Sequence, residues 1–279
     1  MTRNKRISIT GSLVLVGVVI YILFFGKLFP YSPIIIGFEK HELTNTIIYT
    51  QKGVLFYDYE SIDLLISPSE EFHDLEYSSK PEIFLFSDSL NYIRHSLSKA
   101  RFCTFYNGRL FVTPWALNEA LEGEISLETY LTHELSHSLL HQQAGLIKAS
   151  RYPKWLLEGI AVYSSNQMGS SFYPSKCDTY RMIDLGNFMP PDYFKTKNEN
   201  EIKLNVENRI PFMYSEFACI VDYLIANYGK EKFLIYMKTL IKDNDNDEIF
   251  KEVYKVDFNN FIIDFRRFVE NTENSKIML

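Results

Sequence analysis

Apolar and polar residues follow helical spacing most clearly in the middle of the chain. Leucine and tyrosine recur through residues 127–144 at intervals of three and four, and Ser126 before them is a suitable N-cap. Gly145 stands where a helix commonly ends. A second helical pattern starts after Pro153, a residue that suits the first turn of a helix. Because only the short segment 145–152 separates the two helices, we expect them to pack side by side.

The segment ahead of these helices is typical of β-strands. Aliphatic and aromatic residues gather in short runs at 53–57, 63–66, 82–86, 101–106 and 109–112. Asn107-Gly108 is a signal for a two-residue hairpin between the last two runs. Residues 88–99 are expected to form a helix between strands.

The remainder of the chain is predominantly helical by pattern. A polar, irregular stretch is expected over residues 164–209, and three or four helices are expected from Ser215 onward. The layout is therefore a small mixed β-sheet, two central helices and a helical C-terminal half. This order of elements predicts an α+β fold.

The N-terminus has the pattern of a membrane anchor. Residues 7–25 form a run without charged residues, long enough as a helix to span roughly 30 Å. The basic residues Arg3, Lys5 and Arg6 favour an N-terminus in the cytoplasm, with the rest of the chain on the other side of the membrane. No small-residue cleavage site follows the run, which favours an uncleaved anchor over a signal peptide.

We accordingly expect a single-pass protein of the cell membrane with an extracytoplasmic domain. Its expected parts are a basic cytoplasmic tip (1–6), a transmembrane signal anchor (7–25), a juxtamembrane linker (26–50) and one folded domain (51–279).

The net charge and the cysteine residues limit the kinds of ligand and site that we expect in this protein. The first 27 residues hold four basic and no acidic residues, so the remainder carries a formal charge of −10 against −6 for the whole chain. An acidic domain of this kind argues against binding to nucleic acid. Cys103, Cys177 and Cys219 are compatible with one disulfide or with three free thiols, and their spacing matches no metal site.

The run His133-Glu134-Leu135-Ser136-His137 carries the strongest chemical signal. On a helix the two histidines lie one turn apart on the same face, so both imidazoles can reach one metal ion, usually Zn²⁺. Glu134 projects close to that face and can serve a metal-bound water as a base. His141 lies about 12 Å along the helix from His133, too far for the same ion, and is expected to be a supporting or core histidine.

Glu158 is the candidate for a third ligand. It falls in the middle of the second helix, where an unpaired buried carboxylate would be costly and metal ligation would remove that cost. Gly159 beside it would permit close approach of a neighbouring helix. An ordinary surface carboxylate is the alternative.

The two segments together resemble a known enzyme family. His133-Glu134-Leu135-Ser136-His137 followed by Trp155-Leu156-Leu157-Glu158-Gly159-Ile160-Ala161-Val162-Tyr163 looks like the gluzincin zinc metallopeptidases, and is most similar to the peptidase MA-like branch. The resemblance covers roughly residues 80–240 and is strongest over 126–165. It is not metzincin-like, because Leu140 and Gln143 stand where that pattern needs glycine and histidine.

The resemblance implies a zincin-like domain and assigns roles to its residues. One Zn²⁺ would be bound by His133, His137 and Glu158, and Glu134 would be the general base. Tyr214, in a later segment running to Tyr228-Gly229, would supply a second donor to the oxyanion, although a plain core role is equally open for it.

A substrate-binding strand is also implied by the resemblance. In such folds an edge strand ahead of the motif helix pairs with the main chain of an extended peptide. The residues expected to form it are Arg109, Leu110, Phe111, Val112 and Thr113. An ordinary internal strand is the equally weighted alternative.

The expected function is that of a membrane-anchored zinc metallopeptidase acting on peptide or protein substrates. One alternative is a catalytically silent zincin-fold module tethered to the membrane for binding or scaffolding. A zinc-dependent hydrolase of something other than peptides is a third possibility. The intact Glu134 argues against the silent module.

Overall fold

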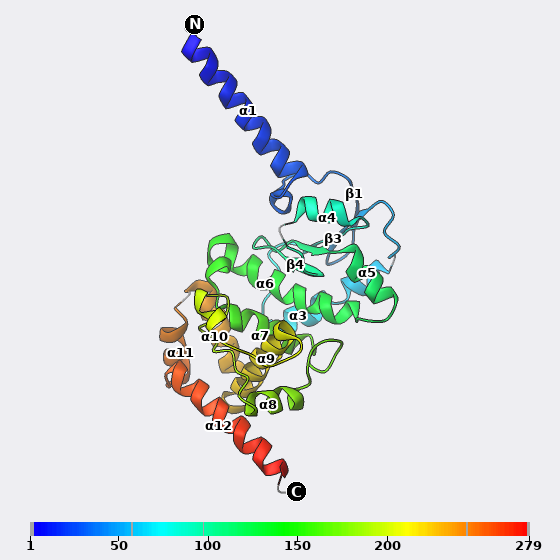
Figure 1. Cartoon of the computed structure of the whole chain (residues 1–279). Coiled ribbons are helices and arrows are strands. Elements are labelled where there is room, and N and C mark those ends of the chain that lie inside the picture. The colour runs from blue at the N-terminus through cyan, green and yellow to red at the C-terminus, as the bar shows by residue number, and fades with distance from the viewer. Residues whose placement is uncertain (1–2, 57, 97, 244, 278–279) are drawn as a thin grey trace.

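The computed structural model describes residues 3–56, 58–96, 98–243 and 245–277, with side chains described only from residue 12 to residue 273 of these. A five-stranded sheet lies at the end of the body near α1, and a helical part lies beyond the long helix α6 (Figure 1). The architecture is α+β, as the sequence predicts, with a small mixed sheet and many helices.

The strands are β1 (Phe38–Glu42), β2 (Ile47–Gln51), β3 (Glu82–Leu85), β4 (Phe102–Thr104) and β5 (Leu110–Val112). The helices are α1 (Arg3–Phe25), α2 (Tyr59–Asp63), α3 (Ile66–His73), α4 (Ser89–His95), α5 (Pro114–Leu121), α6 (Leu127–Arg151), α7 (Lys154–Ser164), α8 (Lys176–Asp184), α9 (Arg209–Tyr228), α10 (Lys230–Lys242), α11 (Asn246–Tyr254) and α12 (Phe258–Ile277). Two 3₁₀ turns, η1 (Phe29–Tyr31) and η2 (Lys197–Glu201), complete the described elements.

The sheet has the order β1-β2-β3-β5-β4. Its three central strands are parallel, and the two outer strands, β1 and β4, run antiparallel to their neighbours. Side chains alternate between the faces. Ile83 and Leu110 enter a core shared with Leu135 of α6, whereas Phe84 and Phe111 enter an aromatic cluster on the other face.

Three of the predicted strand runs, 82–86, 101–106 and 109–112, correspond to β3, β4 and β5. The prediction for 63–66 is wrong, because these residues join the end of α2 to the start of α3. Asp58 caps α2 by accepting a hydrogen bond from the Ser61 amide (3.3 Å), so the chain turns into a helix there. Residues 53–56 form no strand, and residue 57 lies outside the described part.

Two strands were not predicted. β1 and β2 fall within or across the end of the segment 26–50, which we expected to be a linker. β1 reads Phe-Glu-Lys-His-Glu and lies at the edge of the sheet, so its composition is that of an exposed segment. Their turn is held by Asp63, whose Oδ1 accepts from the amides of Asn45 and Thr46 at 2.8 Å.

The predicted hairpin exists with a longer loop. The Phe105 amide donates to the Arg109 carbonyl (2.9 Å), and the Gly108 amide donates to the Phe105 carbonyl (2.8 Å). The loop therefore has three residues, with Gly108 at φ 84° in the position of a bulge. The glycine marks the turn correctly, but it stands at the bulge and not at the centre of a two-residue turn.

The motif helix begins as predicted and extends further. The Ser126 hydroxyl accepts from the Thr129 amide (3.2 Å) as the N-cap of α6. Gly145 breaks the helical path at φ 70° and ψ 162°, a conformation that is open to glycine and costly for other residues. Residues 146–151 then resume a helix, so the connection to α7 is shorter than the expected loop 145–152.

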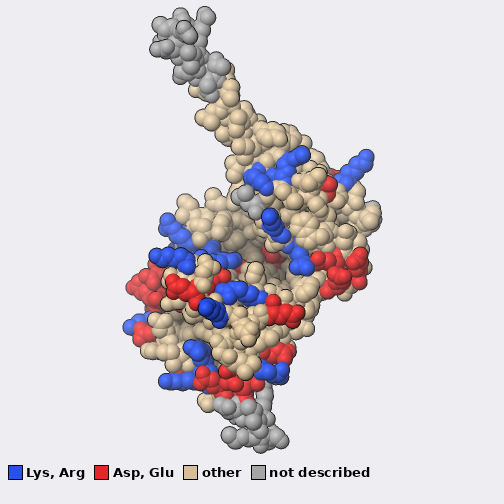
Figure 2. Space-filling model, viewed as in Figure 1, with Lys and Arg blue, Asp and Glu red and all other residues tan. Residues whose placement is uncertain are grey.

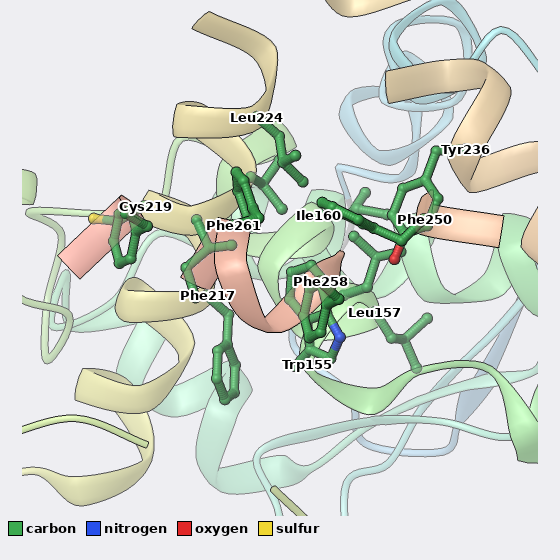
Figure 3. Close-up of a cluster of buried hydrophobic side chains, with 14 of the residues drawn as sticks. Trp155, Leu157, Ile160, Phe217, Cys219, Leu224, Tyr236, Phe250, Phe258 and Phe261 are labelled. Carbon is green, nitrogen blue, oxygen red and sulfur yellow. The ribbon is translucent and has the colours of Figure 1, made fainter. Parts of the chain in front are cut away.

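The helical part has its own large core. Trp155 and Ile160 of α7 meet Phe217 of α9 together with aromatic residues of α10, α11 and α12 (Figure 3). Among the described residues, α9, α10, α11 and α12 make four helices in this part, in agreement with the prediction. The stretch 164–209, expected to be irregular, contains α8 and η2.

Gly159 lies at a close approach of α7 and α9. A Cβ atom placed there would stand 2.7 Å from the carbonyl oxygen of Phe217 and 2.9 Å from its carbonyl carbon. Backbone atoms cannot yield as a flexible side chain can, so only glycine fits. The close approach that we expected at Gly159 is therefore to α9.

The first 25 residues and the cysteines complete the comparison with the sequence. Among the residues that the structure describes, no helix is both long and apolar enough to cross a bilayer. The side chains of residues 7–11 of the expected anchor lie outside the described part, and the anchor remains a prediction. Cys103, Cys177 and Cys219, all described, form no disulfide.

His73 fastens α3 to the motif helix. It is fully buried; its Nδ1–H donates to the Ser69 carbonyl (2.7 Å), and its Nε2 accepts from the Ser136 hydroxyl (2.8 Å). Burial lowers the pKa of His73 to about 4. The neutral imidazole is therefore part of the packing that positions α6.

Substitution of Gly159 by alanine should lower the free energy of unfolding by about 1–3 kcal/mol. Alanine is the better helix former by about 1 kcal/mol, but the clash with the Phe217 backbone outweighs that gain. Denaturant titration of the full chain measures the change. Ser164→Ala, near the end of the same helix, is the control and should stay within about 0.5 kcal/mol of the parent. Equal stability of Gly159→Ala and the parent would contradict the close approach.

Stability should depend on pH through His73. The unfolded chain takes up a proton near pH 6.5, whereas folded His73 stays neutral down to about pH 4. Its contribution is therefore complete above about pH 6.5 and is lost as pH falls toward 4, by about 3 kcal/mol. His73→Gln should flatten this part of a profile of unfolding free energy against pH. An unchanged slope in His73→Gln would refute the assignment.

Candidate metal centre

Three predicted ligands converge between α6 and α7. The ligand atoms of His133, His137 and Glu158 all lie within 4.8 Å of one another. Oε2 of Glu158 is 3.2 Å from Nε2 of His137 and 3.5 Å from Nε2 of His133. The three residues are only 5–7% exposed. This buried group can hold one metal ion, and Glu158 is not the surface carboxylate of the alternative interpretation.

The outer nitrogen of His133 is held by a residue that the sequence did not reveal. Nδ1–H of His133 donates to Oε1 of the buried Gln167 (2.8 Å), which leaves Nε2 as the ring nitrogen that faces Glu158 and His137. A metal-binding histidine typically has such a partner, because it fixes the tautomer and the orientation of the ring. Gln167 follows the C-terminal end of α7, so the same helix that carries Glu158 also leads to the support for His133.

His141 supports the site without joining it. Its Nδ1–H donates to the Phe105 carbonyl (3.0 Å), and its ring stacks on His137 with 6.2 Å between centroids. Burial and the neighbouring charge of His137 lower the pKa of His141 to about 3, so the ring is neutral. This position agrees with the supporting role expected from its distance along the helix.

Burial and charge act in opposite directions on the ligands. Burial alone would raise the pKa of Glu158, but the charge of His137 and hydrogen bonds with both histidines lower that pKa well below its ordinary value. Burial disfavours a charge on His133, yet Glu158 and Glu134 outweigh it and raise the pKa of His133. The carboxylate is therefore ionised at neutral pH and holds both imidazoles toward itself.

The second oxygen of Glu158 has its own donors. Oε1 accepts from Nζ of Lys195 at 2.8 Å and from the hydroxyl of Tyr214 at 2.9 Å. Burial and the charge of Glu158 raise the pKa of Tyr214 well above its ordinary value, so its phenol keeps its proton. The structure thus places Tyr214 at the ligand cluster, as expected, and adds Lys195 to it.

Glu134 is held by the outer strand β4. Its Oε2 accepts from the Thr104 hydroxyl (2.7 Å), which also lies 3.1 Å from the Glu134 carbonyl. The negative charge of Glu134 contributes to the raised pKa of His133. Glu134 is part-buried and lines the same cleft as the three ligands.

The expectation that Arg109, Leu110, Phe111, Val112 and Thr113 form an edge strand is wrong. β5 pairs with β3 on one side and with β4 on the other, so its main-chain hydrogen-bonding groups already have partners within the sheet and are not open to a peptide. Leu110, Phe111, Val112 and Thr113 are completely buried, and Arg109 is bound by Glu82. The outer strand beside the cluster is β4, which the hairpin loop at Gly108 joins to β5.

A cleft of about 620 Å³ opens onto the cluster. Figure 2 shows the surface hollowed between the sheet part and the helical part, with basic and acidic side chains interspersed around it. Its walls include Phe102, Tyr130 and Tyr173, and this mixture of apolar walls with a few polar groups is typical of a binding site. Cys103 also lines it, and burial with the charge of Glu134 raises its pKa to about 12, so it is present as a thiol.

Three supporting residues were not identified from the sequence. Thr104 and Gln167 belong to no spacing pattern, and Lys195 lies in the polar stretch whose course was not readable. Each is brought to the cluster by the packing of separate elements, with sequence separations of 30, 34 and 37 residues from its partner. These residues can be recognised from the three-dimensional structure, but not from a pattern in the sequence.

No protein-family model matches the chain, and no curated protein is found to be similar to it. The residues of the cluster themselves therefore carry the functional interpretation.

Proposed function

We propose that this chain is a zinc-dependent metallopeptidase of the gluzincin type with a zincin-like fold. One observation carries the proposal: two imidazoles and one carboxylate, all buried, converge within 4.8 Å beside a further carboxylate, Glu134. Structural zinc sites commonly use four protein ligands, whereas three protein ligands are typical of catalytic sites with an open position.

The donor set fits zinc. Imidazole nitrogen and carboxylate oxygen are both ordinary zinc ligands, and His₂Glu is a known catalytic set. Gln167 leaves Nε2 of His133 free to act as a ligand atom, and the low pKa of Glu158 keeps its carboxylate charged. His133, His137 and Glu158 would therefore hold the ion.

The surrounding residues have distinct roles in peptide hydrolysis. When bound, zinc polarises a carbonyl group and lowers the pKa of water. Glu134 accepts a proton from the attacking water and passes it to the departing amine nitrogen. Thr104 holds the Glu134 carboxylate in place. The protonated phenol of Tyr214 donates to Glu158 in this structure and would turn from it to donate to the developing oxyanion.

A peptide is the substrate that the surroundings favour. β4 is paired on one side only and lines the cleft through Phe102, Cys103 and Thr104. An extended peptide can add to such an outer strand through main-chain hydrogen bonds, with side chains entering the cleft. This proposal moves the substrate-binding role from β5 to β4.

Attachment to the membrane is a separate part of the proposal. It depends on the uncharged run 7–25 and the basic residues before it, and on nothing in the cleft. The peptidase proposal does not depend on it.

Glu134→Gln should retain zinc and lose hydrolysis. An amide cannot accept the proton, and a general base typically contributes 10²- to 10⁴-fold in rate, so a loss of about that size is expected. Cleavage of a peptide library and zinc content by elemental analysis are the measurements, with Glu128→Gln in the first turn of α6 as the control. Wild-type rates in Glu134→Gln would refute the base. Zinc binding without any peptide cleavage by the parent would favour the silent module.

Removal of a ligand should remove the metal. His137→Ala and Glu158→Ala are each expected to lose stoichiometric zinc, because two remaining ligands bind weakly. His141→Gln should keep zinc, since that ring stacks on His137 but contributes no ligand atom. Elemental analysis after dialysis measures the content, and circular dichroism confirms folding. Full zinc content in Glu158→Ala would exclude Glu158 as a ligand.

A further inference from the structure

We propose that Lys195 is a positioning residue of the metal centre, whose ammonium group fixes the orientation of the Glu158 carboxylate. This inference rests on the proposed function and deepens it. It adds a cation, placed from a loop, to a site whose ligands come from two helices.

The two oxygens of Glu158 have separate partners. Oε2 faces Nε2 of His137 and of His133 at 3.2 and 3.5 Å. Oε1 faces the opposite set, Nζ of Lys195 at 2.8 Å and the Tyr214 hydroxyl at 2.9 Å. With both Oε1 contacts made, the carboxylate presents one oxygen to the imidazoles, and rotation about its terminal bond would break two hydrogen bonds.

The backbone of Lys195 is held for this contact. Lys195 has φ 56°, in the left-handed region that non-glycine residues seldom adopt. Its amide donates to Oε2 of Glu199 at 2.7 Å, which secures the loop beside η2. A sparsely populated backbone conformation that the surroundings maintain is often associated with a functional role.

The side chain of Lys195 is constrained as well. Nζ stands 5.1 Å from the ring centroid of Phe194 and 6.0 Å from that of Tyr214, within the range of cation–π attraction. About half of the side chain is exposed, whereas Glu158 is 5% exposed. Lys195 therefore reaches from the cleft onto a buried carboxylate, unlike a surface pair in which both partners are hydrated.

The charged ammonium group of Lys195 and the neutral hydroxyl of Tyr214 differ in how strongly they hold Oε1 of Glu158. Because the Glu158 carboxylate is ionised, both hydrogen bonds to Oε1 are charge-assisted, but of the two donors Lys195 alone carries the opposite charge, so it contributes more to the orientation of Oε1 than Tyr214 does. Without Lys195, the Tyr214 hydroxyl would be left to hold Oε1, so the carboxylate could turn more easily and offer both oxygens to an ion. Lys195 would thereby favour Oε2 as the oxygen that Glu158 offers to an ion.

The test uses Co²⁺ as a spectroscopic probe in the full-length chain. Lys195→Met removes the charge and the donor, Lys195→Arg keeps both, and Lys197→Met removes a nearby exposed charge as the matched control. Co²⁺ affinity is measured by competition with a chelator, the visible absorption of the Co²⁺-loaded protein is recorded, and thermal melting of the metal-free protein checks the fold.

Lys195→Met should bind Co²⁺ about 10- to 100-fold more weakly, the usual size of an effect from outside the ligand set. Its visible bands should also weaken, because a second carboxylate oxygen raises the coordination number. Lys195→Arg should restore most of the affinity and the spectrum, and Lys197→Met should match the parent.

Unchanged affinity and spectrum in Lys195→Met would overturn the proposal. A loss of affinity with an unchanged spectrum and a lower melting temperature would overturn it too, since Lys195 would then act on folding alone. If the parent itself binds no Co²⁺, the proposed metal site fails, which is a distinct result.

Discussion

The burial of one carboxylate is the constraint on which the centre of this molecule depends. Glu158 lies in the middle of α7 with almost no exposure to water, where an uncompensated charge would cost several kcal/mol. The fold compensates it from every side, with two imidazoles from α6, a phenol from α9 and an ammonium group from a loop. α6, α9 and the loop that supplies the ammonium group are consequently all held at Glu158.

α6 transmits this constraint to the rest of the fold. One side of the helix places Leu131 and Leu135 in the core beneath the sheet, and its later turns place Leu140 in the helical core. The histidines lie between these contacts and face the cleft. Gly145 ends the straight part of the helix, after which the chain returns as α7. The cleft therefore lies where the two cores meet.

The local part of this site could be predicted from the sequence, and the assembled part could not. Histidines four residues apart on a helix share a face whatever surrounds them, so His133 and His137 could be paired from spacing alone. The partner Glu158 followed from helical pattern and a short connection. Strand order obeys no such rule: β5 was expected at the edge from the family resemblance, and nothing in its residues shows that β4 lies outside it. β1 was missed because an exposed edge strand has the composition of a linker.

The sheet separates two layers that differ in their distance from the ligands. Ile83 and Leu110 share a core with Leu135 of α6, whereas Phe84 and Phe111 pack against Phe29 on the other face of the sheet. A changed side chain in the aromatic layer can therefore alter the melting temperature while the ligand geometry survives. A change in the other layer moves the helix that carries both imidazoles. Among descendants of this sequence, the aromatic layer should thus drift faster than the layer beneath the motif helix.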